Sequence, residues 1–396
     1  MPENKGKFKY LVGSKNVSNK ALEPYNKDVC DFLDDFSKML FKEEESKKYS
    51  DLKTLAFWCR KSEISKFKSK LPLTEKRMGL GLIFHITPAN IPTNFAYSLI
   101  FGLLTGNSNI VKVPSQEFKQ VEVICNCINR ILKKKYKIIR DMLSIVRYSE
   151  DDNYTKEISK KCNARMIWGG DKTISAIKLF PTDHKSLDIT FPDRYSFCAI
   201  NSTEILKLNT KSLRELSLKF YNDTFLVDQN ACTSPHLIVW LGKNKTQAKN
   251  QFWQSLYKVV KEKYDLGESA LFDKLTNLYN SILSSDKIKN FKKFGNLIYV
   301  LELKEIEIQN HKFRGKWGFF YELNVSSLDQ LKHQINSRYQ TLSYFGIDKD
   351  ELKNFIFKNN LNGIDRVVPI GQTLDMNLFW DGYDINRILT RVIDIK

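Results

Sequence analysis

The stretch GLGLIFHITPANIP, residues 79–92, decides the fold of this chain. Its first part, Gly79 to Ile86, is a short apolar run between glycines and a proline, which is typical of a buried strand. A loop and a helical pattern from Thr93 to Thr105 follow, and a second apolar strand covers Asn109 to Pro114. A strand, a helix and a strand joined by short links predict a βαβ unit.

The same alternation of strands and helices continues along most of the chain. Further strands are predicted at 143–147, 164–168, 187–191, 197–200, 236–241, 296–302, 317–322 and 341–345. Helices are predicted at 116–134, 151–161, 245–264, 268–284, 327–338 and 350–360. Alternation of this kind is typical of doubly wound α/β units with largely parallel sheets.

Four regions follow from this pattern. Residues 1–75 are charged and helical, and we expect them to pack on a cofactor-binding domain over 76–228. A second α/β domain is predicted at 229–365, and the segment 366–396 is a candidate for oligomerisation or for bridging the domains. A chain of 396 residues is long enough for more than one such unit.

The composition excludes several classes of protein. With 42% hydrophobic residues and no apolar run of membrane-spanning length, the chain reads as globular and without a transmembrane helix. Its first residues, MPENKGKFKYLVG, lack the apolar core of a signal peptide, so we expect a cytoplasmic protein. Seven cysteines without framework spacing argue against disulfides, and the pair Cys125 and Cys127 has no second ligand pair for zinc.

The formal net charge of +18 raises the alternative of nucleic-acid binding. The basic residues are mostly lysines scattered over the helical segments, and the chain carries no RNA-module aromatic motif. A positive surface would equally attract a phosphate-bearing cofactor or an acidic carrier protein. A protein of this fold that binds nucleic acid without catalysis therefore stays as the alternative class.

One cysteine lies in a polar loop, DQNACTSP, residues 228–235, where one α/β region ends and the next begins. Small neighbours around Cys232 leave room for an incoming group, and a thiolate there would attack a carbonyl and hold the acyl group as a thioester. A small residue in a packed loop is the alternative interpretation. None of the five histidines forms a recognisable pair with this cysteine in the sequence.

Two further stretches lie where strands of a doubly wound sheet end. Asn90 follows the first strand of the βαβ unit and stands between two prolines, although asparagine is also common in ordinary turns. Gly169 and Gly170 follow the strand at 164–168 and open a helix, which would let the backbone approach a phosphate. A two-glycine turn by itself is a weak signal.

Several ordered motifs resemble those of the LuxC-type acyl-CoA reductases, a family within the aldehyde dehydrogenase superfamily. The motifs are GLIFHITPANIP (81–92), GLLTGN (102–107), IVKVPS (110–115), QNACTSP (229–235), RGKWGF (314–319), QTLSYFG (340–346), NGIDRVVPIG (362–371), WDG (380–382) and LTR (389–391). The resemblance covers about residues 80–391. It implies an aldehyde dehydrogenase-like fold, with a doubly wound cofactor-binding domain and a second α/β catalytic domain.

The resemblance also implies an activity and its catalytic residues. Cys232 would accept the acyl group from an acyl-CoA or acyl-carrier thioester, and reduction by NADPH or NADH would release an aldehyde. Asn90, with the backbone N–H of Cys232, would donate to the oxyanion. Hydrolytic relatives carry a Glu-Leu-Gly-Gly-type segment before the cysteine, but the corresponding residues 187–196 hold no glutamate and no Gly-Gly, so the thioester should persist.

The cofactor residues are likewise implied by the resemblance. Lys112 matches the lysine that contacts the adenosine ribose, with an exposed strand-end lysine as the alternative. Gly169 and Gly170 lie where the superfamily places its cofactor phosphates. Glu322 is the candidate for the nicotinamide ribose, although an exposed strand carboxylate is the competing interpretation. No metal is expected. Because the chain has no ATP-binding P-loop of its own, a partner acyl-activating ligase is expected, and the alternative is a non-fatty acyl group delivered by that ligase. The superfamily also implies a homodimer or a larger assembly.

Overall fold

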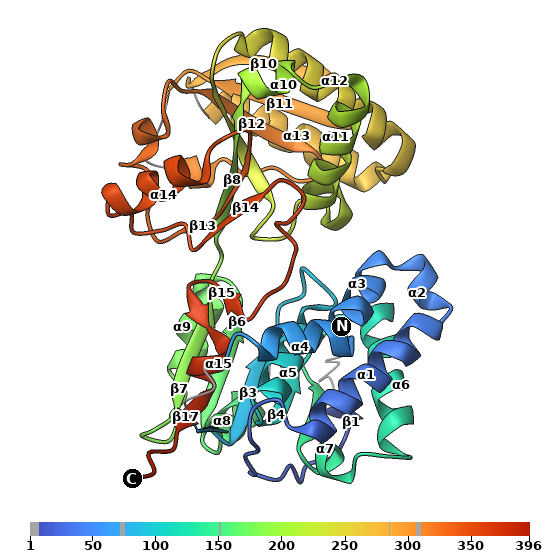
Figure 1. Cartoon of the computed structure of the whole chain (residues 1–396). Helices are drawn as coiled ribbons and strands as arrows, with labels where there is room; N and C mark the ends of the chain where they lie inside the picture. The colour runs from blue at the N-terminus through green and yellow to red at the C-terminus, as the bar shows by residue number, and fades with distance from the viewer. Residues whose placement is uncertain (1–7, 72–75, 150–151, 285, 306–309) are drawn as a thin grey trace. The chain divides into compact units, whose positions relative to one another are not determined.

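Two parallel-strand sheets, each with helices on both faces, organise the computed structural model (Figure 1). The structure describes residues 8–71, 76–149, 152–284, 286–305 and 310–396. The chain divides into a first unit, residues 1–193 with 376–396, and a second unit, residues 194–375. Each unit is described by itself below.

The first unit contains a six-stranded sheet in the order β1-β5-β4-β3-β6-β7. Its strands are β1 (Lys9–Val12), β3 (Leu82–Ile86), β4 (Ser108–Lys112), β5 (Leu143–Arg147), β6 (Ala164–Trp168) and β7 (Leu187–Phe191). Only β1 pairs antiparallel, along β5, while the other pairs are parallel. The strands after β3 are added first on one side and then on the other, so β3 and β6 flank the topological switch point, where doubly wound sheets bind ligands.

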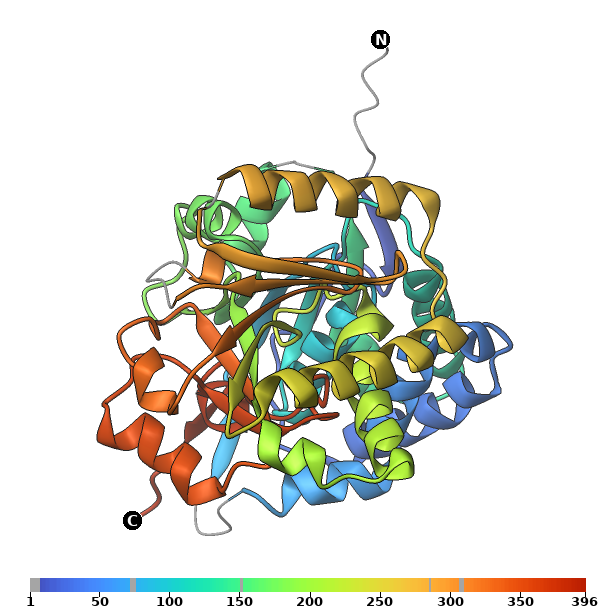
Figure 2. The same cartoon turned by 90° about the horizontal axis from the view of Figure 1, so that it is seen from above.

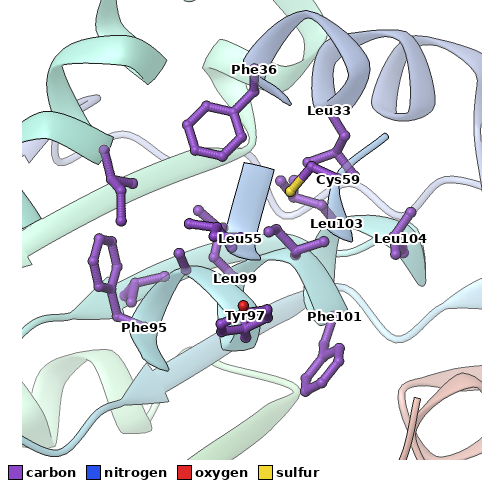
Figure 3. Close-up of a cluster of buried hydrophobic side chains, with 14 of the residues drawn as sticks. Leu33, Phe36, Leu55, Cys59, Phe95, Tyr97, Leu99, Phe101, Leu103 and Leu104 are labelled. Atoms are coloured by element: carbon purple, nitrogen blue, oxygen red, sulfur yellow. The ribbon is translucent and has the colours of Figure 1, made fainter. Parts of the chain in front are cut away.

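Helix α5 (Asn94–Leu104) is buried along its length from Phe95 onward. One side faces the sheet, and α1 (Lys27–Lys42) and α3 (Ser50–Trp58) of the N-terminal region share its core cluster. Figure 3 shows this cluster, with Leu33 and Phe36 from α1 beside Leu99 of α5. A helix that is apolar all round needs cover on every side, which explains why the N-terminal helices pack there.

The remaining elements of the first unit complete its two faces. They are α2 (Glu45–Lys48), α4 (Lys61–Lys68), β2 (Arg77–Gly79), α6 (Lys119–Leu132), α7 (Lys137–Asp141), α8 (Asp152–Ser159), α9 (Asp171–Lys178), β15 (Phe379–Trp380), β16 (Tyr383–Asp384), α15 (Ile385–Ile388) and β17 (Thr390–Val392). The C-terminal strand β17 pairs antiparallel with β2. The end of the chain therefore belongs to the first unit, and its proposed role in oligomerisation stays a prediction.

The second unit contains a seven-stranded sheet in the order β10-β11-β12-β9-β8-β13-β14. Its strands are β8 (Tyr195–Asn201), β9 (Pro235–Leu241), β10 (Ile288–Phe294), β11 (Ile298–Leu303), β12 (Phe319–Asn324), β13 (Tyr339–Phe345) and β14 (Arg366–Pro369). All neighbouring pairs are parallel except β10 with β11. Because β9 and β12 are parallel neighbours, the segments that precede these two strands lie at the same end of the sheet.

Helices cover both faces of this second sheet. They are α10 (Ser202–Leu206), α11 (Thr210–Thr224), η1 (Phe225–Val227), α12 (Lys245–Lys263), α13 (Glu268–Ser284), η2 (Asn310–Lys312), η3 (Leu328–Leu331) and α14 (Lys349–Lys358). Figure 2 shows α13 (gold) and α12 (yellow) on opposite sides of the orange strands β10 and β11. The two core clusters agree, since Leu278 of α13 packs with one face of the sheet and Phe252 of α12 with the other.

The predicted α/β class and most predicted elements are confirmed, and the strands at 143–147, 164–168 and 187–191 match residue for residue. The helix predicted over 327–338 is wrong: a single 3-10 turn, η3, stands there. Leu328, Leu331 and Ile335 are spaced as in a helix, but successive turns are enough to bury them.

The division of the chain differs from the predicted boundaries. Strand β8 lies between β9 and β13, so the second unit begins at residue 194. The predicted boundary had placed residues 194–228 in the first domain. At the other end, β14 completes the second sheet, and the chain joins the first unit only from residue 376.

Candidate functional site

Three predicted site positions meet at one edge of the first sheet. Asn90 follows β3, Lys112 is the last residue of β4, and the pair Gly169 and Gly170 follows β6. Because these strands are parallel neighbours, their carboxyl ends lie side by side. The structure thus gathers the predicted cofactor residues of the first unit at its switch point, whereas Cys232 and Glu322 lie in the second unit.

The loop that carries Asn90 is tied to β4. The backbone N–H and the hydroxyl of Thr87 both donate to the carbonyl oxygen of Lys112, at 3.2 and 2.9 Å. Asn90 itself is exposed, two residues before the turn that opens α5. The Lys112 ammonium lies 4.9 Å from the ring centroid of Tyr148, at a distance suited to a cation–π contact.

The two glycines leave open space at the start of α9. Gly170 is the N-cap of this helix, and no side chain caps it. A Cβ added at Gly170 would meet nothing within 4 Å, and one at Gly169 would meet only Thr173 at ordinary contact distance. Packing therefore does not require glycine here, and a helix N-terminus with free space before it suits a phosphate group. This geometry fits a bound dinucleotide.

A series of buried, hydrogen-bonded polar side chains lies beneath this site, and sequence analysis did not predict it. His85 of β3 lies 2.8 Å from the Ser98 hydroxyl through Nδ1 and 2.9 Å from Asn109 Oδ1 through Nε2. The Trp168 indole N–H donates to the same Ser98 oxygen at 3.0 Å. Because an amide oxygen only accepts, His85 carries its proton on Nε2 and Ser98 donates to Nδ1. These hydrogen bonds fix the side chain of Trp168, the residue directly before Gly169.

Cys232 is half-buried in the turn between η1 and β9. The backbone around it is held at several points. The Ser196 hydroxyl donates to the carbonyl oxygen of Cys232 at 2.6 Å, and the Ser234 hydroxyl donates to that of Asp223 at 2.8 Å. Asp228, at the start of this loop, has a positive φ of 53° and accepts a hydrogen bond from the Tyr264 hydroxyl. The cysteine is thus presented by a fixed backbone.

Gln229 is the main anchor of the loop, and sequence reasoning missed it. Its side chain is 1% exposed, and its oxygen accepts from the N–H groups of Gly318 and Phe319 at 2.9 and 3.0 Å. Its amide nitrogen donates to the carbonyls of Pro235 and Phe319, both at 3.2 Å. The residue is part of the QNACTSP motif, but its partners Gly318 and Phe319 are 89 and 90 residues away in the sequence, so the motif alone does not reveal its role.

Neither buried histidine is suited to act as a general base. Burial lowers the pKa of His236, which stacks on Tyr195 beside the Cys232 loop, to about 3. Burial also lowers the pKa of His85 to about 4, against a weaker opposing effect of its bond to Asn109. Both imidazoles are therefore neutral near pH 7 and play structural roles.

These two histidines predict a loss of stability in acid. Since each pKa is lower in the folded chain than in the unfolded one, the stabilisation is complete above about pH 6.5 and is lost as the pH falls towards 3 to 4. Between pH 7 and 5 each should cost about 2 kcal/mol of unfolding free energy. Urea unfolding at both pH values measures this. A His85→Gln variant should show a shallower pH dependence than wild type, and an unchanged dependence would contradict the assignment.

Glu322 lies in the interior of the second unit. Its carboxylate, 2% exposed, accepts from the Lys249 ammonium at 2.9 Å and from the indole N–H groups of Trp240 and Trp253 at 3.2 and 3.1 Å. The interpretation as an exposed strand carboxylate is therefore wrong. The ribose contact stays an untested prediction, but burial and these three internal partners argue against it.

The described part of the chain lacks two features, a metal-binding cluster and a membrane-spanning helix. No group of three or more histidine, cysteine, aspartate or glutamate side chains there is arranged to hold a metal ion. No described helix is both long and apolar enough to cross a membrane.

Comparison with known proteins places these features in a family. The model of the family described as acyl-CoA reductase (LuxC) matches residues 19–266. The long-chain acyl-protein thioester reductase of Photorhabdus laumondii is 27% identical over 344 residues, and that of Vibrio harveyi is 24% identical over 325. Each match covers 79% of this chain but only 62% and 63% of those proteins, so the chain spans less than two thirds of their length.

Solved structures agree on the fold. Aldehyde dehydrogenase 21 from Physcomitrella patens, in complex with succinate, has a TM-score of 0.65 and 13% identity over 92% of this chain and 85% of that one. A salicylaldehyde dehydrogenase from Pseudomonas putida G7 has a TM-score of 0.63 and 12% identity, over 94% and 85%. The predicted aldehyde dehydrogenase-like fold is thereby confirmed.

Proposed function

Since the chain belongs to the LuxC family of acyl-CoA reductases, we propose that it reduces an activated acyl group to an aldehyde through a thioester on Cys232. The observation that carries this proposal is the position of Cys232, half-buried in a turn that Gln229 fixes to the sheet at four hydrogen bonds. A nucleophile must be accessible and held in one geometry, and this loop supports both requirements.

In the first step the Cys232 sulfur attacks the thioester carbonyl of the donor, and the donor thiol leaves with a proton. The carbonyl oxygen becomes negatively charged during the attack, so nearby N–H donors stabilise it. We propose the backbone N–H of Cys232 and the side-chain amide of Asn90 for this role. The exposed position of Asn90 at the edge of the first sheet supports its assignment.

In the second step the thioester is reduced. A bound nicotinamide cofactor, NADPH or NADH, supplies the hydride for this step. We propose that Lys112 binds the adenosine ribose and that the backbone at Gly169 and Gly170 lies against the cofactor phosphates. The open space before α9 supports this arrangement. The resulting oxyanion at Cys232 then collapses, so that the carbon–sulfur bond breaks and the aldehyde leaves. No role in cofactor binding is proposed for Glu322.

The donor is an acyl thioester, either acyl-CoA or an acyl group on a protein thiol. The family description names acyl-CoA, and the curated relatives are named for acyl-protein thioesters. We propose that a partner acyl-activating ligase supplies the acyl group in the second case. A homodimer is proposed as the assembly, with the segment from residue 366 as its candidate contact.

Mass spectrometry of the intact protein tests this function. After mixing with tetradecanoyl-CoA, the wild type should gain one acyl increment, and peptide mapping should locate it at Cys232. A Cys30→Ala variant, which removes the other half-buried cysteine, should be acylated equally. NADPH should then clear the increment and release tetradecanal. An increment that neither NADPH nor NADH clears would indicate acyl transfer without reduction. No increment with long-chain, short-chain or carrier-bound thioesters would end the proposal.

The glycine pair gives a prediction for cofactor binding. Gly170→Ala should leave the melting temperature within about 2 °C of wild type, since the added methyl group meets open space. If a phosphate lies in that space, the same methyl group should weaken NADPH binding roughly tenfold, or about 1.4 kcal/mol. Titration of NADPH fluorescence measures the Kd, and Gly267→Ala, at a second open glycine in the other unit, is the control. Unchanged affinity in Gly170→Ala would place the phosphates elsewhere.

A further inference from the structure

Helix α13 carries a buried lysine on its inner face. The Lys274 ammonium is 1% exposed and donates to the carbonyl oxygens of Asn296, Leu297 and Trp317, at 3.0, 2.7 and 2.8 Å. It also lies 4.3 Å from the ring centroid of Tyr299. An ammonium group has three donors, so all three are used on backbone carbonyls. A buried charge is costly unless it is well bonded, and here the bonds hold separate chain segments together.

The same helix contacts this region at a second point. Asn277, one turn after Lys274, donates from Nδ2 to the carbonyl oxygen of Arg314 at 3.2 Å. Residues three apart lie on one face of a helix, so both side chains reach the segment Arg314–Gly318. We refer to this segment as the RGKWG segment. Helix α13 is thereby bonded to the RGKWG segment at two residues, Arg314 and Trp317.

The RGKWG segment has a backbone that only fixed surroundings maintain. Trp317 and Gly318 both have positive φ angles, 56° and 79°. A left-handed conformation is unusual for a bulky residue such as tryptophan and needs support from its neighbours. A Cβ at Gly315 would approach the carbonyl oxygen of Phe319 to 2.2 Å, so this glycine packs closely on the following strand. The segment therefore has one tightly specified shape.

The other side of the RGKWG segment contacts the loop of Cys232. The N–H of Trp317 donates to the carbonyl of Asp228 at 3.2 Å, and the N–H of Gly318 donates to Gln229 Oε1 at 2.9 Å. Trp317 is thus bonded through its carbonyl to Lys274 and through its N–H to the cysteine loop. Cys232 follows Gln229 by three residues. A series of hydrogen bonds therefore leads from α13 to Asp228 and Gln229, in the loop of the candidate nucleophile.

We propose that Lys274 is a positioning residue for Cys232, acting through the RGKWG segment and Gln229. The ammonium group holds Trp317 in its left-handed conformation, which in turn fixes the turn from Asp228 to Cys232. The assignment of Cys232 as the nucleophile rests on the proposed function, but the dependence of its reactivity on Lys274 does not. Lys274 contacts no substrate in this proposal and has no chemical role in either step.

Alkylation of Cys232 by iodoacetamide tests the proposal without any acyl chemistry. Peptide mass spectrometry gives the rate constant at Cys232 alone, at a temperature where each variant is folded by circular dichroism. Lys274→Met, which keeps the length of the side chain but loses all three donors, should change the rate at least fivefold. Asn277→Ala, which removes only the contact to Arg314, should change it about twofold. If Lys274→Met does not fold, Asn277→Ala decides.

The matched control lies one turn along the same helix. Leu278→Ala removes core packing from α13, where Leu278 belongs to the apolar cluster of that face, but leaves the side-chain hydrogen bonds of Lys274 and Asn277 in place. It should lower the melting temperature comparably and leave the alkylation rate within a factor of 1.5. Equal changes in Lys274→Met and Leu278→Ala would show a mere stability effect and overturn the proposal.

A double-mutant cycle shows whether the two residues share one path. If Lys274 acts through Gln229, the effects of Lys274→Met and Gln229→Leu on the alkylation rate should be strongly non-additive. Fully additive effects would overturn the proposed path. Acylation by tetradecanoyl-CoA is followed separately in the same variants. Its absence in wild type would refute the proposed function, while the alkylation rates would still decide the role of Lys274.

Discussion

Replacing Cys232 by alanine is expected to lower kcat/KM for aldehyde formation by a factor on the order of 10⁴ or more, as the loss of a covalent nucleophile usually does. The thiol is the group that forms the acyl intermediate in the proposed mechanism, and water cannot replace it in a step that needs a thioester. The rate of NADPH oxidation with tetradecanoyl-CoA measures the effect, and direct detection of the aldehyde confirms it.

The structure provides the controls for this experiment. Cys232 is half-buried in a turn that the side chains of Gln229, Ser196 and Ser234 help to hold, so alanine should change the unfolding free energy by less than about 1 kcal/mol. Cys30→Ala should keep wild-type activity, because Cys30 lies in the first unit on α1. A Cys232→Ala enzyme that still forms aldehyde at more than about a tenth of the wild-type rate would rule out the covalent route.

The second large effect concerns the stability of the second unit. Lys249→Met is expected to lower its unfolding free energy by about 3–5 kcal/mol, as the breaking of a buried ion pair does. The Lys249 ammonium lies 2.9 Å from Glu322 and 3.4 Å from Glu302, and these two glutamates are in register on neighbouring strands. Without the ammonium, the buried Glu322 carboxylate would lose the cation that it shares with the partly exposed Glu302. Urea unfolding followed by tryptophan fluorescence measures the loss.

Two further variants distinguish the effect of losing the buried charge from that of losing a surface charge. Lys289→Met removes a lysine that is 61% exposed and 3.6 Å from Glu302, so it should cost less than about 1 kcal/mol. Lys249→Met combined with Glu322→Gln should recover part of the lost stability, because the neutral amide oxygen still accepts from the indoles of Trp240 and Trp253. Similar losses of unfolding free energy in Lys249→Met and Lys289→Met would show that burial of the ion pair does not determine the effect.

The fold could be predicted largely from local patterns. Short apolar runs predicted β3, β5, β6 and β7, and their alternation with helices predicted a doubly wound sheet. Because doubly wound sheets bind ligands where their strands end, the same patterns pointed to Asn90 and Gly169, whereas Lys112 was implied by the family resemblance. Short apolar runs and turn residues act within a few residues of each other, so the sequence carries their information directly.

The candidate site was only partly predictable. The sequence pointed to Cys232 through its small polar neighbours and through the ordered motifs around it. It did not reveal Gln229 or Lys274, whose hydrogen bonds join residues 90 and 43 positions apart. It also suggested a ribose contact for Glu322, whereas the structure gives that carboxylate Lys249 and two tryptophans as partners. The partner of a buried polar group depends on which strands and helices become neighbours.

By itself, then, the sequence determined the class of fold, most of the strands and the loop of the candidate nucleophile Cys232, since these depend on periodicity and turn chemistry over short stretches. Only the tertiary structure decided the strand order, and with it the boundary between the units, because β8 pairs with β9 and β13 rather than with the strands that precede it. It also decided which buried groups support Cys232. Strand order and polar pairing arise from contacts between distant segments, and local propensity does not encode these contacts.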